Sequence, residues 1–327
     1  MKTHWMKRAM ALALTAALLT GSASALFGKK EEPVQSAEGA PMVRDIEITT
    51  YKDIPYEAQF LASDSEGDDM TYAVVEEPKK GTVEIDGVNF TYTPKEGATG
   101  GDSFTYAATD SAGNVSAPAT VTVTIEKTKS GVMYSDTEGC KAAAAAQYLA
   151  EAGIFTGTKM GDQYYFEPDR TVSRSEFLAL VLETAGHEVT DVTMTGFCDD
   201  EAIPTWAKAY ASAGVAQGII QGKTTAEGAA FRGEETITFN EAATVLDRVL
   251  DMGDVDLDVW YADRNAVPSW AAQAVGNMEA LNVLSVGSFG SQSMEQAVTR
   301  ADAAQMLSAA KTLLEGEAPE GLLSFLQ

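Results

Sequence analysis

Three blocks with one internal order fill the second half of the chain. They open with YSDT at 134–137, FCDD at 197–200 and YADR at 261–264, at spacings of 63 and 64 residues. Each block then runs through a helical segment, a turn-forming stretch and a capped apolar helix. Such a repeat indicates units that bury a shared core, because one unit alone cannot cover its apolar face. We expect three repeats that fold together: block 1 (131–190), block 2 (194–254) and block 3 (257–316).

Each block is predicted to hold two amphipathic helices. The closing segments VSRSEFLALVLETA, ITFNEAATVLDRVL and VTRADAAQMLSAAKTLL all begin with a hydroxyl residue three positions before an acid, which is a capping box. In block 2, one face of the closing helix carries Ala242, Val245, Leu246, Val249 and Leu250. Two helices with one apolar face each cannot enclose a core, whereas three pairs can. We therefore expect a compact three-fold helical bundle.

Two of the three closing helices begin with an arginine, Arg174 in block 1 and Arg300 in block 3. The positive end of the helix dipole disfavours a cation there by about 0.3–1 kcal/mol. Helix N-termini also receive anions, so such an arginine becomes favourable when it binds a carboxylate. The alternative is a solvent-exposed arginine at a helix end. Recurrence at matching positions favours the binding interpretation.

These blocks resemble S-layer homology modules, the triplets that hold proteins non-covalently on Gram-positive cell walls. The resemblance rests on the aromatic-x-Asp openings, the Trp-Ala helix start, the turn AQGIIQG and the helix start VTRAD, and it covers residues 134 to about 314. It implies binding of a secondary wall polysaccharide with ketal-linked pyruvate, in grooves between neighbouring modules at the cell surface. The positions that the resemblance assigns to this ligand are Asp136, Arg174, Asp199, Trp206, Asp263, Trp270 and Arg300.

The aspartates and tryptophans of this set also have structural interpretations. An aspartate can accept sugar hydroxyls or fix a turn, and a tryptophan can stack on a sugar or pack as a wedge. Three positions depart from the family pattern: Lys141 replaces a tryptophan, Phe239 replaces an arginine and Asp302 replaces a glutamate. Arginine and tryptophan thus occur together only in block 3. We expect one or two working grooves, and a larger loss of wall binding from Arg300→Ala than from a change at Phe239.

The residues before the repeats alternate with period two. TVTVTI alternates threonine with Val121, Val123 and Ile125, and turn signals divide 41–127 into about seven short strands, which is typical of a β-sandwich. The stretches DSEGDDMTYAVVEEPKKGTVEIDGVNFTYTP and GDSFTYAATDSAGNVSAPATVTVTI resemble bacterial cadherin-like or Ig-like modules of surface proteins, which implies a spacer or adhesion role. The expected architecture is multidomain, an all-β sandwich followed by an α-helical pseudo-threefold bundle.

The N-terminus predicts export. MKTHWMKR, the apolar AMALALTAALLTG and Ala23-Ser24-Ala25 form a secretory signal peptide at 1–25, with an uncleaved anchor as the alternative. A linker is expected at 26–40 and a tail at 317–327. Cleavage lowers the formal charge from −25 to −28, which argues against a nucleic-acid binder. No later segment predicts membrane insertion, and neighbouring surface proteins are a further class of partner.

Residues for catalysis are scarce. His4 lies in the signal peptide, and His187 follows Gly186 at a helix end, where it is predicted to cap the helix. A histidine-based triad or two-histidine metal site is therefore excluded. Composition leaves open a two-carboxylate glycoside hydrolase, but no barrel pattern is present to hold such a pair. We expect a non-catalytic protein without a cofactor.

Two further features leave alternatives open. Acidic residues gather in the turns of the sandwich, and their oxygens suit Ca²⁺, so a calcium-dependent adhesin is the alternative function and solvated turns the simpler interpretation. The candidate ligands are Asp64, Glu66, Asp68, Asp69 and Asp110. The cysteines Cys140 and Cys198 form either one disulfide or two free thiols.

Overall fold

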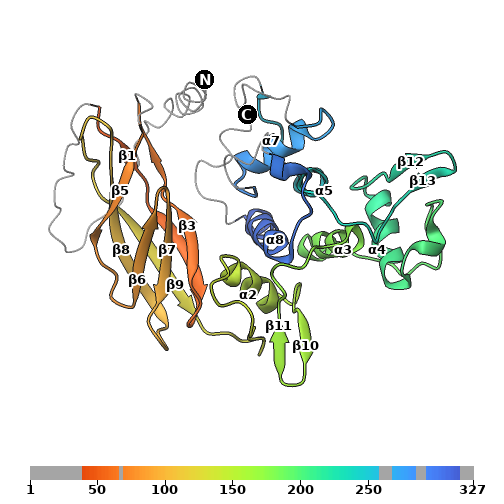
Figure 1. The fold of residues 1–327 in the computed structure, drawn as a ribbon, viewed down its shortest axis with the longest axis horizontal. Helices are drawn as coiled ribbons and strands as arrows, with labels where there is room; N and C mark the ends of the chain where they lie inside the picture. Colours follow the sequence, from red (N-terminus) through yellow and green to blue (C-terminus); the bar gives the residue numbers. More distant parts are fainter. Residues whose placement is uncertain (1–38, 66–68, 258–266, 285–291, 317–327) are drawn as a thin grey trace, which may run out of the picture. The chain divides into compact units, whose positions relative to one another are not determined.

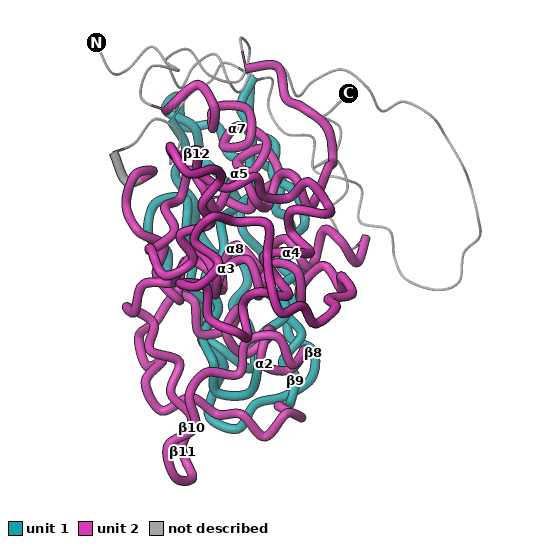
Figure 2. Tube along the Cα trace, turned by 90° about the vertical axis from the view of Figure 1, so that its right-hand side faces the viewer, with its two compact units in different colours: residues 1–127 teal, residues 128–327 magenta. Residues whose placement is uncertain are grey.

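The structure is a computed structural model that describes residues 39–65, 69–257, 267–284 and 292–316. It divides into two compact units, 1–127 (unit 1) and 128–327 (unit 2), which Figure 2 colours separately. The predicted signal peptide, nearly all of the linker and the tail at 317–327 lie outside the described residues. Within the described ranges, no helix combines the length and apolar character needed to span a bilayer.

Unit 1 is a sandwich of a four-stranded and a three-stranded sheet (Figure 1). The turn signals predict about seven strands over 41–127, and the described residues there form nine, of which seven make up these two sheets. One sheet has the order β2-β9-β8-β5, with β2 parallel to β9, and the other has the order β3-β7-β6. The strands β1 and β4 form a separate short pair. In chain order the strands are β1 (Met42–Val43), β2 (Ile46–Tyr51), β3 (Tyr56–Gln59), β4 (Ala62–Ser63), β5 (Thr71–Glu76), β6 (Gly81–Asp86), β7 (Asn89–Pro94), β8 (Gly100–Thr109) and β9 (Ala119–Glu126).

The period-two pattern fixes which side chains enter this core. Along β9, Val121, Val123 and Ile125 are buried while the threonines between them are exposed. The hairpin between β6 and β7 turns at Gly87, whose φ of 60° is costly for residues with a Cβ. The largest fully buried side chains of unit 1 are Phe90, Tyr92, Phe104 and Tyr106.

Among the described residues of unit 2, each block supplies the two helices that the sequence predicts. They are α2 (Ala143–Glu151) and α3 (Arg174–Thr184) in block 1, α4 (Thr205–Ala216) and α5 (Phe239–Leu250) in block 2, and α7 (Ala272–Ala280) and α8 (Arg300–Leu314) in block 3. The closing helices α3, α5 and α8 pack against one another (Figure 1). Each also packs on the opening helix of a different block, α3 on α4, α5 on α7 and α8 on α2. The blocks are therefore interleaved.

The residues just before the closing helices join the three blocks through their backbones. Val172 donates its N–H to the carbonyl of Val298, Val298 donates to Ile237, and Ile237 donates to Val172, at 2.9, 2.8 and 3.1 Å. These three bonds form a closed cycle, and all three side chains are buried. Because every block both donates and accepts, the cycle fixes the starting points of α3, α5 and α8 relative to one another.

All three predicted capping boxes form. Ser173, Thr238 and Thr299 each accept the N–H of the acidic residue three positions on, and that acid returns a bond to the backbone of its cap. The helix α3 ends as predicted, with Gly186 at a φ of 67° and the N–H of His187 bonded to the carbonyl of Leu182. Sequence signals of short range thus place the helix ends correctly.

A short hairpin follows the opening helix in blocks 1 and 2. The first is β10 (Thr158–Met160) with β11 (Gln163–Tyr165), and the second is β12 (Lys223–Thr225) with β13 (Gly228–Ala230); the first projects away from the helices of unit 2 in both ribbon views (Figures 1 and 2). Gly157 and Gly222 precede these hairpins at positive φ, where an added Cβ would lie 2.4 Å from the carbonyl oxygen of Tyr165 and 2.9 Å from that of Ala230. Only glycine fits at these two turns.

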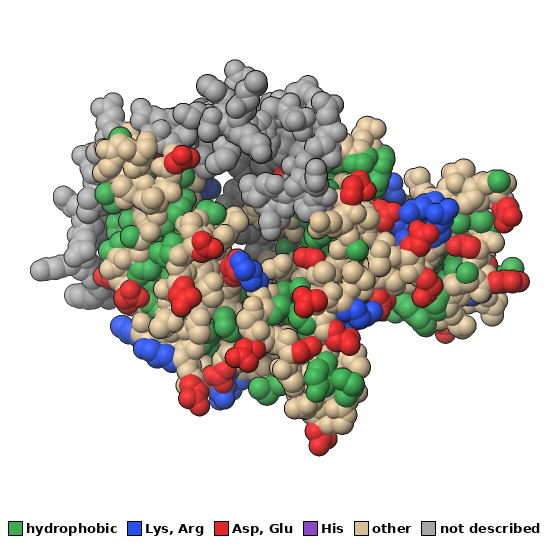
Figure 3. All heavy atoms as spheres, in the orientation of Figure 1, with side chains coloured by type: hydrophobic (Ala, Val, Ile, Leu, Met, Phe, Trp, Pro, Cys, Tyr) green, Lys and Arg blue, Asp and Glu red, His purple; other side chains and the backbone are tan. Residues whose placement is uncertain are grey.

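The surface of the described residues reflects the acidic composition. Figure 3 shows acidic side chains scattered over the visible face, with lysine and arginine in a few small groups. Among the described basic residues, Arg170, Lys208 and Lys223 are paired with acids.

Candidate ligand-binding site

The opening aspartates hold the backbone of their own blocks. The carboxylate of Asp136 accepts the N–H groups of Phe166 and Glu167 at 2.8 and 2.7 Å. In block 2, Asp199 accepts the N–H groups of Phe231 and Arg232 at the same two distances. These contacts are those of the turn-fixing interpretation, and each carboxylate uses both oxygens in them. Asp263, the third member of the set, lies outside the described residues.

Arg300 is buried rather than solvent-exposed, with 5% of its surface accessible. Its guanidinium lies over the rings of Phe155 and Phe166, 4.3 and 5.4 Å from their centres, and its Nε donates to the carbonyl of Phe166. Its Nη2 is buried and has no hydrogen-bond partner among the described residues. Burial, followed by the nearby charge of Arg170, lowers the pKa of Arg300. A desolvated donor of this kind favours an anionic partner.

A cavity of about 210 Å³ adjoins this guanidinium. Its lining includes Phe155, Arg170, Glu176, Leu180, Trp206 and Arg300. All three blocks contribute to it, since α8 supplies Arg300, block 1 supplies most of the wall and α4 supplies Trp206. By sequence, Arg300 is matched with Trp270 of its own block, but the structure brings it together with Trp206 of block 2. The interleaving of the helices causes this exchange.

Both described tryptophans are largely exposed. Trp206 lies in the first turn of α4 with 51% of its surface accessible, and its ring meets that of Tyr210 edge-on at 6.4 Å between centres. Trp270 precedes α7 and is 58% accessible, but it does not line the cavity at Arg300. Neither ring is a buried wedge, so the face of Trp206 is available beside the cavity.

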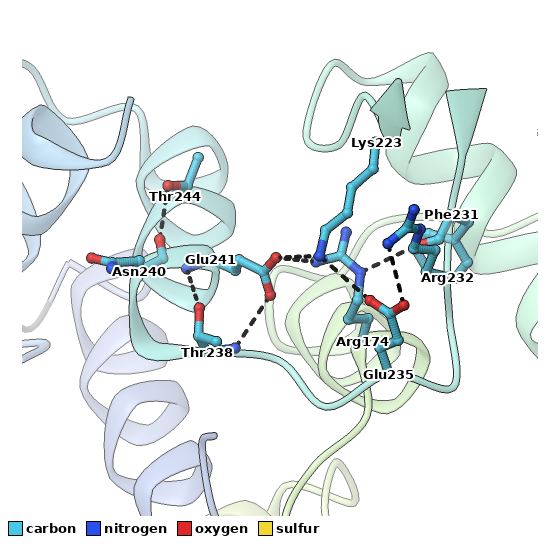
Figure 4. A network of polar contacts seen from close by, with 9 residues as sticks. All are labelled: Arg174, Lys223, Phe231, Arg232, Glu235, Thr238, Asn240, Glu241 and Thr244. Carbon is cyan, nitrogen blue, oxygen red and sulfur yellow. Dashed lines mark hydrogen bonds and ion pairs between the residues drawn. The ribbon is translucent and has the colours of Figure 1, made fainter. Parts of the chain in front are cut away.

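Arg174 occupies the corresponding place at the start of α3, with a different set of partners (Figure 4). Its Nε donates to the carbonyl of Phe231 at 3.1 Å, which repeats the contact of Arg300 with Phe166. Its Nη1, however, lies 3.0 Å from Oε1 of Glu241, and Lys223 approaches the same oxygen at 3.1 Å. The guanidinium of Arg174 is therefore already paired with a carboxylate of this chain.

Two of the three departures from the family pattern, Phe239 and Lys141, lie at or just before helix starts. Phe239 begins α5 at the position that Arg174 and Arg300 occupy in the other closing helices, and it packs against the core of unit 2. Lys141 lies just before α2 with its side chain exposed. The arginine position of block 2 thus contributes packing and no charge.

The remaining candidates form no metal site among the described residues, where no group of three or more histidine, cysteine or acidic side chains is arranged to hold an ion. Asp110 is buried and accepts the backbone and side-chain N–H groups of Asn114, at 2.8 and 2.9 Å. Asp64 is also buried and Asp69 is exposed, while Glu66 and Asp68 lie outside the described residues. Both Cys140 and Cys198 are free thiols, so the free-thiol alternative describes the structure.

Sequence reasoning found the arginine and tryptophan of the cavity but missed Arg170 and Glu176 as parts of its lining. Glu176 was assigned only to the capping box. The counterpart of Arg170 in block 2 is Glu235, which also stands three residues before its cap residue. The one available signal was this reversal of charge between two otherwise matching blocks.

Comparison with known families finds one match in each unit. Residues 38–125 match the model of a bacterial Ig domain, and residues 134–178 match the model of an S-layer homology domain. The second match covers most of block 1 and does not extend to blocks 2 and 3. The first unit is thus Ig-like, and an S-layer homology domain follows it, which indicates a location at the cell surface.

Among solved structures, the chain is similar to an endo-fucoidan hydrolase of glycoside hydrolase family 107, with 22% identity and a TM-score of 0.24 over 29% of this chain. It is also similar to the fibronectin(III)-like modules of Clostridium thermocellum CbhA, with 16% identity and a TM-score of 0.21 over 28% of this chain. The matches span only 15% and 48% of those chains. A comparison with curated proteins finds no match.

Proposed function

We propose that this chain is a non-catalytic, exported surface protein that unit 2 holds on the cell wall of a Gram-positive-type bacterium. The Ig domain then acts as a spacer or adhesion module. The S-layer homology match in block 1 supports the attachment role, and the signal peptide predicted at 1–25 agrees with export. No described group of residues favours a reaction over recognition.

We infer further that all three blocks are S-layer homology modules around a pseudo-three-fold axis. Three observations support this inference: the cycle of backbone bonds through Val172, Ile237 and Val298, the three capping boxes, and the regular exchange of helix partners between blocks. The matched aspartate contacts in blocks 1 and 2 add a fourth.

The proposed ligand is a wall polysaccharide with a pyruvate ketal, and one observation carries this choice. Nη2 of Arg300 is buried without a partner in a cavity that the exposed ring of Trp206 borders. A pyruvylated sugar offers a carboxylate for the guanidinium and an apolar ring face for the indole. Neither group alone would specify such a sugar, whereas the two together recognise both of its parts.

The test is co-sedimentation of the mature protein with purified wall sacculi, before and after acid removal of the secondary polysaccharide. We expect binding to intact sacculi, its loss after stripping and a loss of about tenfold in Trp206→Ala, since aromatic anchors dominate such contacts. Because Trp206 is half exposed, this change should leave the melting temperature unaltered. Met194→Ala, at a residue 72% exposed, is the control. Equal binding to stripped and intact sacculi would contradict the polysaccharide assignment.

A further inference from the structure

The capping glutamates of blocks 1 and 2, Glu176 and Glu241, share one carboxylate contact and differ in the other. In both, Oε2 accepts the N–H of the cap residue, from Ser173 to Glu176 at 2.9 Å and from Thr238 to Glu241 at 3.3 Å. Oε1 of Glu241 then pairs with Arg174, the arginine that starts the closing helix of the preceding block. Oε1 of Glu176 instead pairs with Arg170 of its own block at 2.8 Å.

One sequence difference accounts for this contrast. Arg170 stands three residues before its cap residue, and the matching position of block 2 is Glu235. An arginine at this position can reach the capping glutamate, whereas a glutamate cannot pair with it. Glu241 is therefore left for Arg174 and Lys223, which Figure 4 shows converging on its carboxylate. Glu176 is held by Arg170, and Arg300 keeps an unpartnered Nη2.

We propose that Arg170 is a positioning residue that makes the Arg300 cavity the anion-ready groove, because it holds Glu176 and leaves the Arg300 guanidinium free for a ligand carboxylate. The Arg174 guanidinium is paired with Glu241 and takes no ligand while this ion pair is formed. The inference rests on the proposed function only for the identity of the ligand. Of the two arginines, only Arg300 is then expected to bind a ligand carboxylate, so that each chain binds one.

Without Arg170, Glu176 is the acid that would neutralise Arg300. Glu176 lines the same cavity, and its bond to the Ser173 N–H keeps the carboxylate at the start of α3. Burial acts to raise its pKa, but the bonds from Arg170 and Ser173 and the charges of Arg170 and Arg300 lower it overall. When Arg170 is removed, the bond from Ser173 and the charge of Arg300 still favour the ionised carboxylate, and its Oε1 would compete with a ligand for Nη2 of Arg300.

The test uses isothermal titration of the mature chain with a soluble probe, a methyl hexopyranoside that carries one pyruvate ketal. Arg170→Glu copies the residue of block 2 and should weaken probe binding by at least about tenfold, since a charge-assisted contact to the ligand is lost. Arg170→Lys retains a cation for Glu176 and should stay near the wild-type affinity. The methyl ester of the probe should bind weakly to all variants.

Two further variants separate positioning from direct contact and from bulk charge. Arg170→Gln combined with Glu176→Gln leaves no carboxylate at either position and should bind the probe near the wild-type affinity, which a direct contact from Arg170 to the ligand would not allow. Arg232→Glu makes the same charge change on a side chain of similar exposure, 44% against 42%, and should bind as wild type. Melting curves confirm folding of each variant.

Wild-type affinity in Arg170→Glu, or a double variant that binds the probe weakly, would overturn the inference. So would a wild-type chain that fails to bind the probe, even if it still binds wall sacculi, in which case attachment stands and the carboxylate groove does not. A chain that binds the probe but no sacculi would overturn the proposed wall attachment and leave the role of Arg170 intact.

Discussion

The carboxylate of Asp136 and the backbone N–H of Phe166 are joined at 2.8 Å, and the carbonyl of the same Phe166 receives the Nε of Arg300. One residue thus connects the opening of block 1 to the arginine of block 3. Block 2 repeats the arrangement, with Asp199, Phe231 and Arg174 in the same roles. The conserved geometry within the chain indicates that the opening aspartates position the acceptor of each arginine.

Asp136→Ala should therefore reduce stability first and binding second. Two hydrogen bonds to a charged acceptor are lost, and two backbone N–H groups lose their partner, at a cost of about 2–3 kcal/mol in the free energy of unfolding. Urea unfolding measures this change, with the exposed acid Glu138→Ala as the control. If wall binding vanished while the unfolding free energy stayed constant, Asp136 would be a ligand contact instead.

Arg300→Met should separate binding from folding. The guanidinium is buried with an unpartnered Nη2, and replacing such a charge by an apolar side chain of similar size is often neutral for stability. We expect a free energy of unfolding within about 1 kcal/mol of wild type and loss of binding to wall sacculi. Phe239→Leu is the matched change at the start of α5 and should retain binding. Retained binding in Arg300→Met would remove this arginine from the site.

Short-range signals in the sequence predict the elements of this fold well. The capping boxes at Ser173, Thr238 and Thr299 mark three helix starts, and the alternation of Val121, Val123 and Ile125 marks a strand, because each signal acts within a few residues. Hydrogen bonding at a helix end and side-chain alternation along a strand need no knowledge of the rest of the chain.

The composition of the cavity could not be read in the same way. Arg300 and Trp206 line one cavity because α3 packs on both α4 and α8, and these partners come from different blocks. Alignment of repeats compares equivalent positions, so it matches Arg300 with Trp270 and cannot report an exchange between blocks. The role of Arg170 was hidden for a related reason, since it differs from its counterpart Glu235 and so falls outside the repeated pattern.

Tyr106→Phe should destabilise the Ig domain and alter its response to alkali. The hydroxyl oxygen of Tyr106 lies 2.7 Å from the carbonyl oxygen of Arg44 and 3.0 Å from that of Leu61, and these two acceptors share its single proton. Loss of the hydroxyl should cost about 1 kcal/mol at neutral pH. Burial raises the pKa of Tyr106 to about 12, above the ordinary value near 10.

The sign of this pH effect follows from the raised pKa. The stability that neutral Tyr106 contributes is fully present below the unfolded pKa near 10 and is lost as the pH rises through the folded pKa near 12. Between pH 10 and pH 12, the free energy of unfolding of unit 1 should fall less steeply with pH in Tyr106→Phe than in wild type. Parallel curves would show that Tyr106 has no part in the alkaline loss.

Asp247→Asn should stabilise unit 2 at neutral pH. Asp247 lies on α5, and its Oδ1 accepts the side-chain amide of Asn277 at 2.8 Å, while the same amide nitrogen donates to Asp254 at 2.9 Å. Burial raises the pKa of Asp247, and the charge of Asp254 raises it further. The hydrogen bond from Asn277 lowers the pKa, but the net shift is upward. An asparagine keeps an acceptor for Asn277 without the charge.

Because the folded pKa is raised, the contribution of Asp247 to stability is complete below its unfolded pKa near 4 and is lost as the pH rises through the folded value. We expect the melting temperature of Asp247→Asn to exceed that of wild type by about 2–4 °C at pH 7, and the two to converge in acid below that unfolded pKa. Glu234→Gln, at an exposed acid, should show no such difference. A lower melting temperature for Asp247→Asn at pH 7 would mean that the charge-assisted bond to Asn277 outweighs the burial of the carboxylate.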